Sequence, residues 1–155
     1  MLKYELIRVD DRLIHGQVLI KWMKVLNVKR VVVLSDDLDA DPIMKALMKQ
    51  TIPSDMKLDI WNLKAGIENI YKENGEALIL LQDVNALYEL FENGIQIKRV
   101  SISRLPCEQK KEKICEHVFV SMEERKKLGI LLNRGVDIKI QPVPDSEAID
   151  LRNLL

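Results

Sequence analysis

The residue types that most often build metal sites, disulfides and aromatic binding surfaces are scarce in this chain. Its 155 residues include only 2 cysteines, 2 histidines, 2 tryptophans and 2 phenylalanines. Because a chain of this length folds without covalent cross-links, we expect Cys107 and Cys115 to be free thiols. Cys115 and His117 would share one face of a strand, but two ligands are too few for a zinc site. We therefore expect no metal, and no motif indicates another cofactor.

Long apolar runs and export signals are also missing. No stretch approaches the roughly 18 unbroken apolar residues that cross a bilayer. The first residues contain a strand-like run, YELIRV, in place of the basic and then apolar regions of a secretion signal. The sequence therefore predicts a cytoplasmic protein.

An excess of one charge sign is absent as well. The 24 Lys and Arg residues balance the 24 Asp and Glu residues. Proteins that bind nucleic acids or anionic lipid surfaces usually carry a basic excess. We therefore expect no nucleic-acid partner, and we expect any protein partner to be recognised through a local surface.

The chain does contain enough apolar material for one core. Hydrophobic residues make up 47% of the sequence and charged residues 31%, a composition typical of globular proteins. The length fits a single domain, and no internal repeat, linker or change in composition divides it. We expect one domain over residues 1–155.

Short apolar runs rich in β-branched residues alternate with longer segments of helical period. This alternation predicts an α/β fold whose sheet is largely parallel. Strands are expected at residues 4–9, 29–34, 57–61, 77–81, 99–102, 117–120 and 137–142. Helices are expected at residues 18–27, from 42 to before 53, and at 63–72, 85–92 and 121–134, with one more helical turn at the C-terminus.

Local signals mark several helix ends. Asp41 followed by Pro42 is typical of a helix start, and Ser121 opens a capping-box pattern. Asp83 can cap the helix that follows it, and Gly94 suits a left-handed helix end. The helix that begins at Pro42 is expected to bury an apolar stripe made of Ile43, Met44, Leu47 and Met48.

Two polar segments are expected to lie at the surface. The acidic segment 35–41 (SDDLDAD) is predicted to be a loop after the second strand. The charged segment 104–116 (RLPCEQKKEKICE) is predicted to be a solvated loop or a short helix.

The segment most informative about function is residues 10–17, DDRLIHGQ, which follows the first strand and opens the first helix. Ligands of open parallel sheets gather at the carboxyl ends of the strands, and the free amides of a helix N-terminus bind anions. His15 offers an imidazole that is partly neutral near pH 7 and can act as a nucleophile or base. This position favours phosphate chemistry.

Neighbours of His15 supply complementary groups. Arg12 carries a planar fork suited to phosphoryl oxygens, and Gly16 allows the backbone to approach a bound group. Asp10 or Asp11 can accept a hydrogen bond from His15 and fix its tautomer, or can hold Arg12 in place. The sequence does not choose between the two aspartates.

A structural role is the competing interpretation for these residues. A histidine beside an arginine in a loop is often only hydrogen-bonded, but His15 lies among charged residues at a strand-to-helix junction, where function concentrates. The second histidine, His117, is expected on a strand and is assigned a structural role. Trp22 and Trp61 are expected to pack in the core.

The segment RVDDRLIHGQV, with Trp22 shortly after it, resembles the signature of the enzyme IIB components of the mannose, fructose and sorbose class of sugar phosphotransferase systems. The segments VVVLSDDLDADPIMKALMKQTIPSDMKLDI, LILLQDVNALYELFENGIQIKRV and ERKKLGILLNRGVDIKIQPVP are also similar to this family, so the resemblance covers almost the whole chain. It implies a doubly wound sheet with helices on both faces.

The resemblance also implies a function. His15 would take a phosphoryl group from the phosphohistidine of a IIA partner, on the ring nitrogen nearer the backbone. It would pass the group to sugar held by membrane IIC and IID partners, with which the protein would associate peripherally. Site residues implied beside His15 are Arg12, Asp10 and Asp11 for catalysis, and Arg12, Gly16, Gln17 and Ser103 for phosphate binding.

One segment departs from the family pattern. The family usually carries Asn-x-Gly-Gly after the fifth strand, whereas this chain has Ser101, Ile102, Ser103 and Arg104. Ser103 or Arg104 can supply phosphate contacts that backbone amides make elsewhere, or the change alters partner recognition or reduces activity. These alternatives stay open at the level of sequence.

Two other classes of function compete with the phosphocarrier. A regulatory domain of the same fold would bind a IIA-like partner without phosphoryl uptake. A magnesium-dependent phosphohydrolase would use Asp10, Asp11, Asp36 and Asp37 as metal ligands. The sequence identifies neither the sugar nor the oligomeric state, and a homodimer is one alternative.

Overall fold

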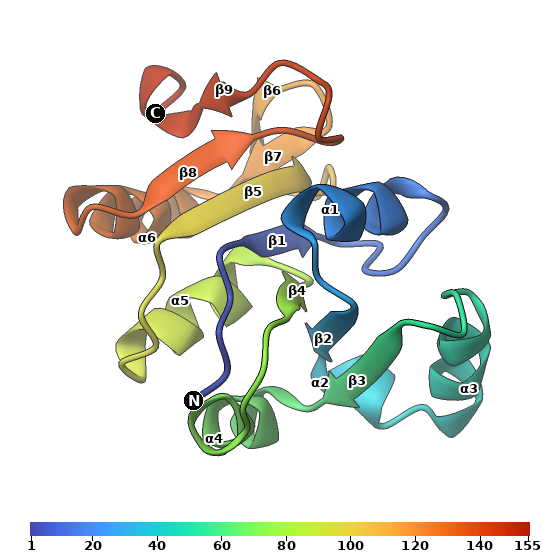
Figure 1. Cartoon of the computed structure of the whole chain (residues 1–155). Coiled ribbons are helices and arrows are strands. Elements are labelled where there is room, and N and C mark those ends of the chain that lie inside the picture. The colour runs from blue at the N-terminus through green and yellow to red at the C-terminus, as the bar shows by residue number, and fades with distance from the viewer.

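The computed structural model describes residues 1–155 and contains one open, twisted sheet with helices packed on both of its faces (Figure 1). Seven strands form this sheet in the order β3-β2-β4-β1-β5-β8-β9. All neighbouring strands are parallel except β8 and β9, which are antiparallel. The strands are β1 (Ile7–Asp10), β2 (Arg30–Leu34), β3 (Lys57–Trp61), β4 (Leu78–Leu81), β5 (Arg99–Arg104), β8 (Asp137–Ile140) and β9 (Ile149–Asp150). The α/β prediction with a largely parallel sheet is confirmed.

Two clusters of buried apolar side chains join the sheet to the helices, one on each face. The larger cluster of 26 buried residues includes side chains of α4, α5 and α6, and the smaller cluster of 13 includes those of α1. Strands buried on both faces need such apolar runs, which explains the run of Val31, Val32 and Val33. The helices are α1 (Val18–Leu26), α2 (Asp36–Asp39), α3 (Pro42–Gln50), α4 (Leu63–Lys72), α5 (Val84–Glu92), α6 (Met122–Asn133) and the 3₁₀ turn η1 (Leu151–Asn153).

Capping hydrogen bonds are present at three of the predicted helix starts. The side chains of Asp41, Asp83 and Ser121 accept hydrogen bonds from the backbone N–H three residues later. Asn27, the residue after α1, and Gly94, the second residue after α5, take left-handed conformations with φ of 54° and 80°. Local side-chain chemistry therefore determines where these helices start and stop.

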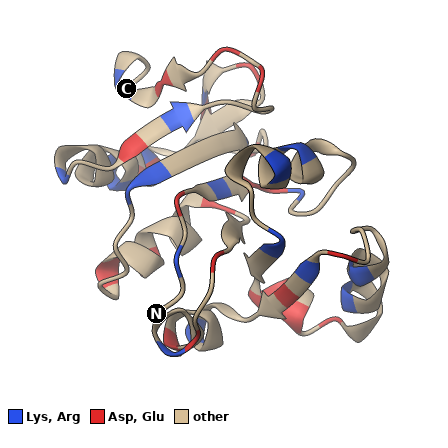
Figure 2. Ribbon diagram, viewed as in Figure 1, with Lys and Arg blue, Asp and Glu red and all other residues tan.

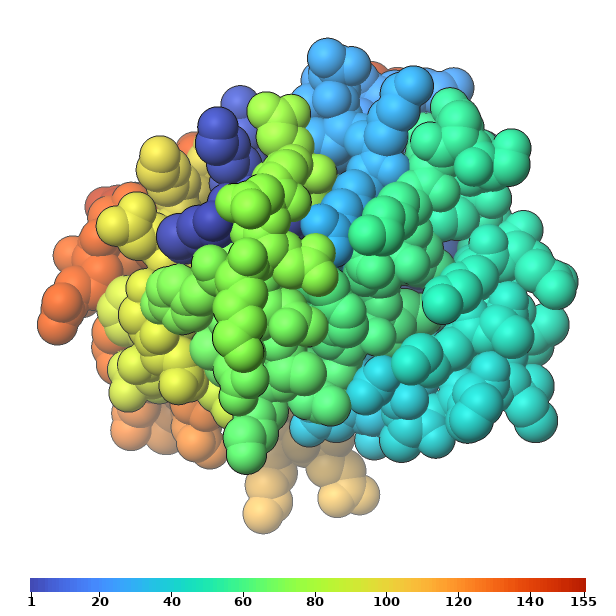
Figure 3. Space-filling view, turned by 60° about the horizontal axis from the view of Figure 1, so that its bottom comes forward, coloured from blue at the N-terminus to red at the C-terminus, as the bar shows by residue number.

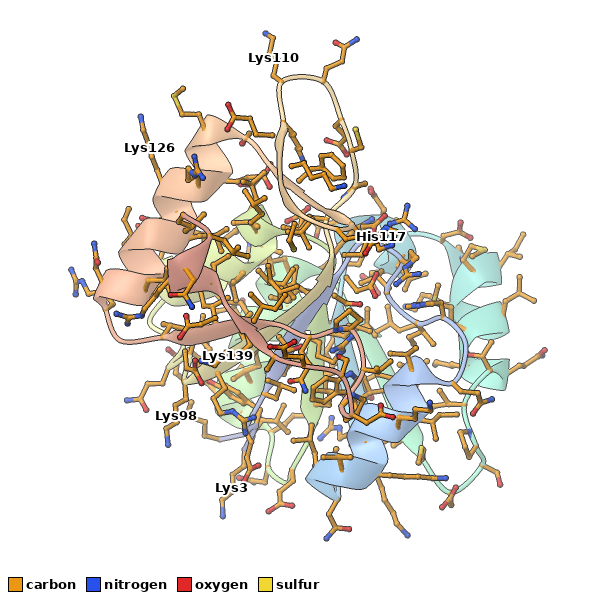
Figure 4. The ribbon with its side chains drawn as sticks, turned by 90° about the horizontal axis from the view of Figure 1, so that it is seen from above. Lys3, Lys98, Lys110, His117, Lys126 and Lys139 are labelled. Carbon is orange, nitrogen blue, oxygen red and sulfur yellow. The ribbon has the colours of Figure 1, made fainter.

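The predictions for the two polar segments were wrong in part. The acidic segment 35–41 contains α2, which forms because the Ser35 hydroxyl caps it by accepting a hydrogen bond from Leu38 N–H. The charged segment 104–116 contains a strand, β6 (Glu112–Cys115), which pairs antiparallel with β7 (Val118–Val120). The loop that contains Lys110, just before β6, projects from the body of the molecule (Figure 4). The side chains of the charged strand β6 alternate too weakly between polar and apolar for the sequence to predict a strand there.

The predicted burial of α3 was also wrong. None of its residues is buried, and Ile43, Met44 and Leu47 are 74%, 40% and 52% exposed. The helix follows β2 toward the edge strand β3 and lies at the margin of the molecule (Figures 1 and 3). Only Met48 of the predicted stripe packs against the core. Helical periodicity identified the helix, but the sheet does not extend far enough to cover its apolar face.

Acidic and basic residues are interspersed along the ribbon, in keeping with the balanced composition (Figure 2). The structure contains no helix of the length and apolar character that a membrane crossing demands. Cys107 and Cys115 are free, as predicted.

The carboxyl end of β1 is a topological switch point. The chain leaves β1 toward α1 on the face of the smaller cluster, whereas the connections after the neighbouring strands β4 and β5 lead to α5 and α6 on the opposite face. Crevices at such points are the usual ligand sites of doubly wound sheets. Residues 10–17 begin here.

Candidate active site

The loop after β1 is held in one shape by its own backbone. Leu13 N–H donates to the Asp10 carbonyl at 3.0 Å, and Leu13 adopts φ of 56°, an uncommon left-handed conformation for a side chain of this size. The side chains of Leu13 and Ile14 are buried in the smaller cluster. Gly16 also has positive φ, 54°, and a Cβ there would meet no atom within 4 Å. Backbone conformation is therefore the reason for glycine at this position.

Asp10 and Arg12 form a two-pronged pair in this loop. Arg12 Nε donates to Oδ1 and Arg12 Nη2 donates to Oδ2, both at 3.1 Å, and Arg12 N–H adds a third bond to Oδ1 at 3.0 Å. Asp10 is 1% exposed, whereas the Arg12 side chain is 39% exposed. Asp10 is thus the buried anchor and Arg12 the part of the pair that reaches solvent.

Burial by itself would raise the pKa of the Asp10 carboxyl. The side-chain and backbone hydrogen bonds from Arg12 and the charges of Arg12 and His15 outweigh that effect and leave the pKa of Asp10 below its ordinary value. Asp10 is therefore a carboxylate at neutral pH.

His15 stands beside this pair and is partly open to solvent. Its Nδ1 lies 3.8 Å from Asp10 Oδ2, its side chain is 30% exposed, and Nδ1 itself is buried without a hydrogen-bond partner. The structure therefore brings Asp10, and not Asp11, next to the imidazole. Nδ1 therefore faces Asp10 and is closed to solvent in this conformation, so attack by this nitrogen would require the ring to turn.

Helix α1 begins immediately after the loop. Its N-cap residue, Gln17, is exposed and makes no side-chain capping bond, and the first turn contains no acidic residue. The N-terminal amides of a helix without a side-chain cap remain available to an anion. Gly16 and Gln17, both predicted to contact phosphate, lie at this helix start.

Asp11 turns away from His15 toward the end of β5. Its N–H donates to the Arg104 carbonyl at 3.3 Å, and its Oδ1 lies 3.2 Å from Arg104 Nε. This contact is an ion pair and not a hydrogen bond. Asp11 Oδ1 is buried and accepts no hydrogen bond from any group. Ser103, one residue before Arg104, is 3% exposed on the strand next to β1. The segment that departs from the family pattern therefore borders the active loop.

A buried arginine that the sequence interpretation did not single out lies beneath the loop. Arg8 is 2% exposed, donates to Ser101 Oγ at 3.0 Å and to the carbonyls of Gln141 and Pro142 at 3.2 Å each. Burial is the largest cause of the lowered pKa of Arg8, which is about 10. The charge of Asp10 raises this pKa and the charge of Arg12 lowers it further. A charged residue inside the otherwise apolar run LIRV was the signal that could have identified it.

The acidic residues required by the hydrolase alternative do not gather. Asp10 is bonded to Arg12, Asp11 is paired with Arg104, and Asp36 Oδ1 accepts from Leu63 N–H. No three Asp, Glu, His or Cys side chains are placed to hold a metal ion. The arrangement instead offers an imidazole, arginines and helix amides to one small anion.

The molecule is thus a doubly wound α/β protein with an imidazole, arginine side chains and helix amides at its switch point, where proteins of this architecture bind ligands. Comparison with known proteins assigns it to a family. The model for "PTS system sorbose subfamily IIB component" matches residues 4–155. The chain therefore belongs to the sorbose subfamily of phosphotransferase-system IIB components, which are phosphotransferases of sugar transport.

Individual relatives are similar to this chain over almost its whole length. The chain is 28% identical to the fructose-specific EIIB component of Bacillus subtilis, over 100% of this chain and 97% of that protein. It is 30% identical to the mannose-specific EIIAB component of Escherichia coli, over 97% of this chain and 47% of that protein. The crystal structure of manxB from Thermoanaerobacter tengcongensis superposes with a TM-score of 0.91 at 28% identity, covering 98% of this chain and 94% of that one.

Proposed function

We propose that this protein carries a phosphoryl group on His15, taking it from the phosphohistidine of a IIA partner and passing it to sugar bound by membrane IIC and IID partners. The observation that carries the proposal is the position of His15: partly exposed at the switch point, beside Asp10 and Arg12, and just before an uncapped helix N-terminus. The similarity to a relative named as an EIIAB component supports a IIA partner.

Phosphoryl transfer between two histidines requires the protein to position the reacting groups and to stabilise charge. As the P–N bond to the donor histidine breaks, a P–N bond to His15 forms, and the donor imidazole leaves with the electron pair. Both imidazoles keep the proton on their other nitrogen, so no proton is gained or lost. Positioning and charge stabilisation supply most of the catalysis in phosphoryl transfer.

Each site residue has a role that follows from its contacts. Arg12 faces solvent where the transferred group arrives, and Asp10 holds Arg12 and limits the orientation of the His15 ring. The helix amides near Gly16 and Gln17 receive phosphoryl oxygens. In this proposal the His15 ring turns to present Nδ1, and the protein works in the cytoplasm against its membrane partners.

The test uses the fact that the chain has only two histidines. Wild type, His15→Ala and His117→Ala are incubated with phosphoenolpyruvate, the general phosphotransferase proteins and a cognate IIA, and are then measured by intact mass. We expect one acid-labile phosphoryl group on wild type and His117→Ala and none on His15→Ala. Adding membranes with cognate IIC and IID and sugar should then discharge the group.

A wild-type protein that gains no phosphoryl group would contradict the proposal and favour the regulatory alternative. Uptake that persists in His15→Ala would place the carrier elsewhere. Fructose and mannose, which appear in the names of the relatives, head the panel of sugars to be tested.

A further inference from the structure

Two exposed arginines contact the loop that carries His15, and they differ in how many of their guanidinium N–H groups are already bonded. Arg12 uses Nε and Nη2 on the two oxygens of Asp10, so most of its fork is already engaged. Arg104 makes one ion-pair contact, through Nε, and neither of its terminal nitrogens makes a hydrogen bond. The Arg104 side chain is 41% exposed. Arg104 therefore has the larger unused capacity for an incoming anion.

Arg104 is also held near the loop that carries His15. It ends β5, the strand beside β1, and its carbonyl accepts the N–H of Asp11 while its Nε lies against the Asp11 carboxylate. Asp11 is four residues before His15 and only 22% exposed. Because the backbone and the side chain are both tied to Asp11, the guanidinium has a restricted range on the side of the loop next to β5.

The charges of the site leave room for an anion. Arg8, Arg12 and Arg104 carry three positive charges, and Asp10 and Asp11 carry two negative ones. Arg8 is buried and already donates three hydrogen bonds inside the protein, so its charge contributes only at a distance. A phosphoryl group on His15 adds about two negative charges, as phosphate monoesters do near neutral pH. A second arginine whose terminal N–H groups are free can bind this added negative charge through charge-assisted hydrogen bonds.

We propose that Arg104 is a second phosphoryl-binding arginine, held by Asp11, whose terminal nitrogens bind the phosphoryl group on His15. The proposal rests on the assignment of His15 as the phosphorylated residue. It gives a function to the position where the family pattern has a glycine, and it assigns Asp11 the role of positioning Arg104 and not His15.

The first test measures transfer. Wild type, Arg104→Ala and Arg104→Lys are phosphorylated by a saturating phosphorylated IIA partner, and the rate is followed by rapid quenching and intact mass. Loss of one charged donor to a transferred group costs about 10- to 100-fold in rate, and lysine should recover part of it because it keeps the charge without the fork. Arg99→Ala, at the exposed opposite end of β5, is the matched control and should stay within about twofold of wild type.

The second test needs no partner protein. His15 is phosphorylated chemically with phosphoramidate, which releases ammonia as the new P–N bond forms, and the phosphoryl group is titrated by ³¹P NMR. A nearby cation favours the more negative phosphoryl form, so the titration midpoint should rise in Arg104→Ala and stay unchanged in Arg99→Ala. A role for Arg104 in folding alone would not shift this midpoint.

An unchanged transfer rate together with an unchanged titration in Arg104→Ala would overturn the proposal. A higher KM for the donor at an unchanged maximal rate and titration would make Arg104 a docking contact and would also overturn it. If the phosphotransferase proteins fail to label wild type, the proposed function fails, while the titration of the chemically labelled protein still decides whether Arg104 binds the phosphoryl group.

Discussion

The guanidinium of Arg8 lies 4.7 Å above the indole ring of Trp22, and both side chains donate hydrogen bonds to the carbonyl of Pro142. This contact ties α1, which follows the active loop, to the segment after β8. It therefore links the position of the loop to a part of the chain about 120 residues away.

Arg8→Met should destabilise the protein strongly. The substitution keeps an apolar stem of similar length but removes the three hydrogen bonds that Arg8 donates to Ser101 Oγ and to the carbonyls of Gln141 and Pro142. The two carbonyls keep one donor each, Ser101 Oγ and Trp22 Nε1. Hydrogen bonds from a charged donor contribute about 1.5–3 kcal/mol each, and relief of the cost of burying the guanidinium offsets part of their loss, so we expect a net loss of about 2–4 kcal/mol in urea unfolding. Arg99→Met, at the exposed start of the same β5 strand, should change the midpoint little. Equal midpoints for the two variants would show that the Arg8 contacts contribute nothing.

Asp10→Asn should reduce stability at neutral pH and have a smaller effect in acid. Because the pKa of Asp10 is lower in the folded protein, its carboxylate contributes stability above its ordinary pKa, and this is lost as pH falls through the lower folded-state pKa. The difference in urea midpoint between wild type and Asp10→Asn should therefore shrink between about pH 5 and pH 2. The variant should also be phosphorylated about tenfold more slowly, because Arg12 loses its anchor.

Asp145→Asn supplies the control for that pH series. Asp145 is exposed and makes no hydrogen bond or ion pair, so its variant should follow wild type at every pH. A gap between wild type and Asp10→Asn that stays constant as the pH falls would contradict the assigned titration of Asp10.

Two glycines in helices should respond to alanine in opposite directions. A Cβ at Gly66 in α4 would overlap Cδ2 of the buried Leu34, so Gly66→Ala should cost about 1–3 kcal/mol. A Cβ at Gly129 in α6 would meet no atom within 4 Å, so Gly129→Ala should gain about 0.5–1 kcal/mol from helix propensity. Urea unfolding of both variants checks the pair, and stabilisation by Gly66→Ala would contradict the packing of α4 on β2.

Tyr4 should give the protein a pH-dependent contribution in the alkaline range. Its hydroxyl donates to the Gln96 carbonyl at 2.9 Å, and burial, with a smaller effect from Tyr71, raises the pKa of Tyr4 from 10.0 to about 12. The neutral phenol is therefore favoured in the folded state, so its contribution is complete below pH 10 and is lost as pH rises through about 12.

Comparison with Tyr4→Phe isolates this effect, because the titration of the lysines is common to both proteins. The variant should be less stable than wild type by about 1 kcal/mol at pH 8, the value of one hydrogen bond. The difference should fall toward zero between pH 10 and pH 12. A constant difference across that range would show that Tyr4 does not titrate with a raised pKa.

Much of the fold could be predicted because it depends on local chemistry. Asp41, Asp83 and Ser121 cap helices where the sequence places them, and apolar runs such as 31–34 are buried on both faces of the sheet. Predictions of burial failed where burial depends on whether a neighbouring element packs against the residue. Ile43 and Leu47 have helical spacing, but no neighbouring element covers them.

The sequence by itself determined the α/β class, the single domain and the loop that carries His15, because periodicity and turn residues act over a few positions. Tertiary structure decided which aspartate approaches His15, that Arg104 reaches Asp11, and that Arg8 is buried beneath the loop. These contacts join residues of different strands and turns. Their geometry depends on parallel pairing of β1 with β5 and of β5 with β8, which brings together residues that are far apart in the chain.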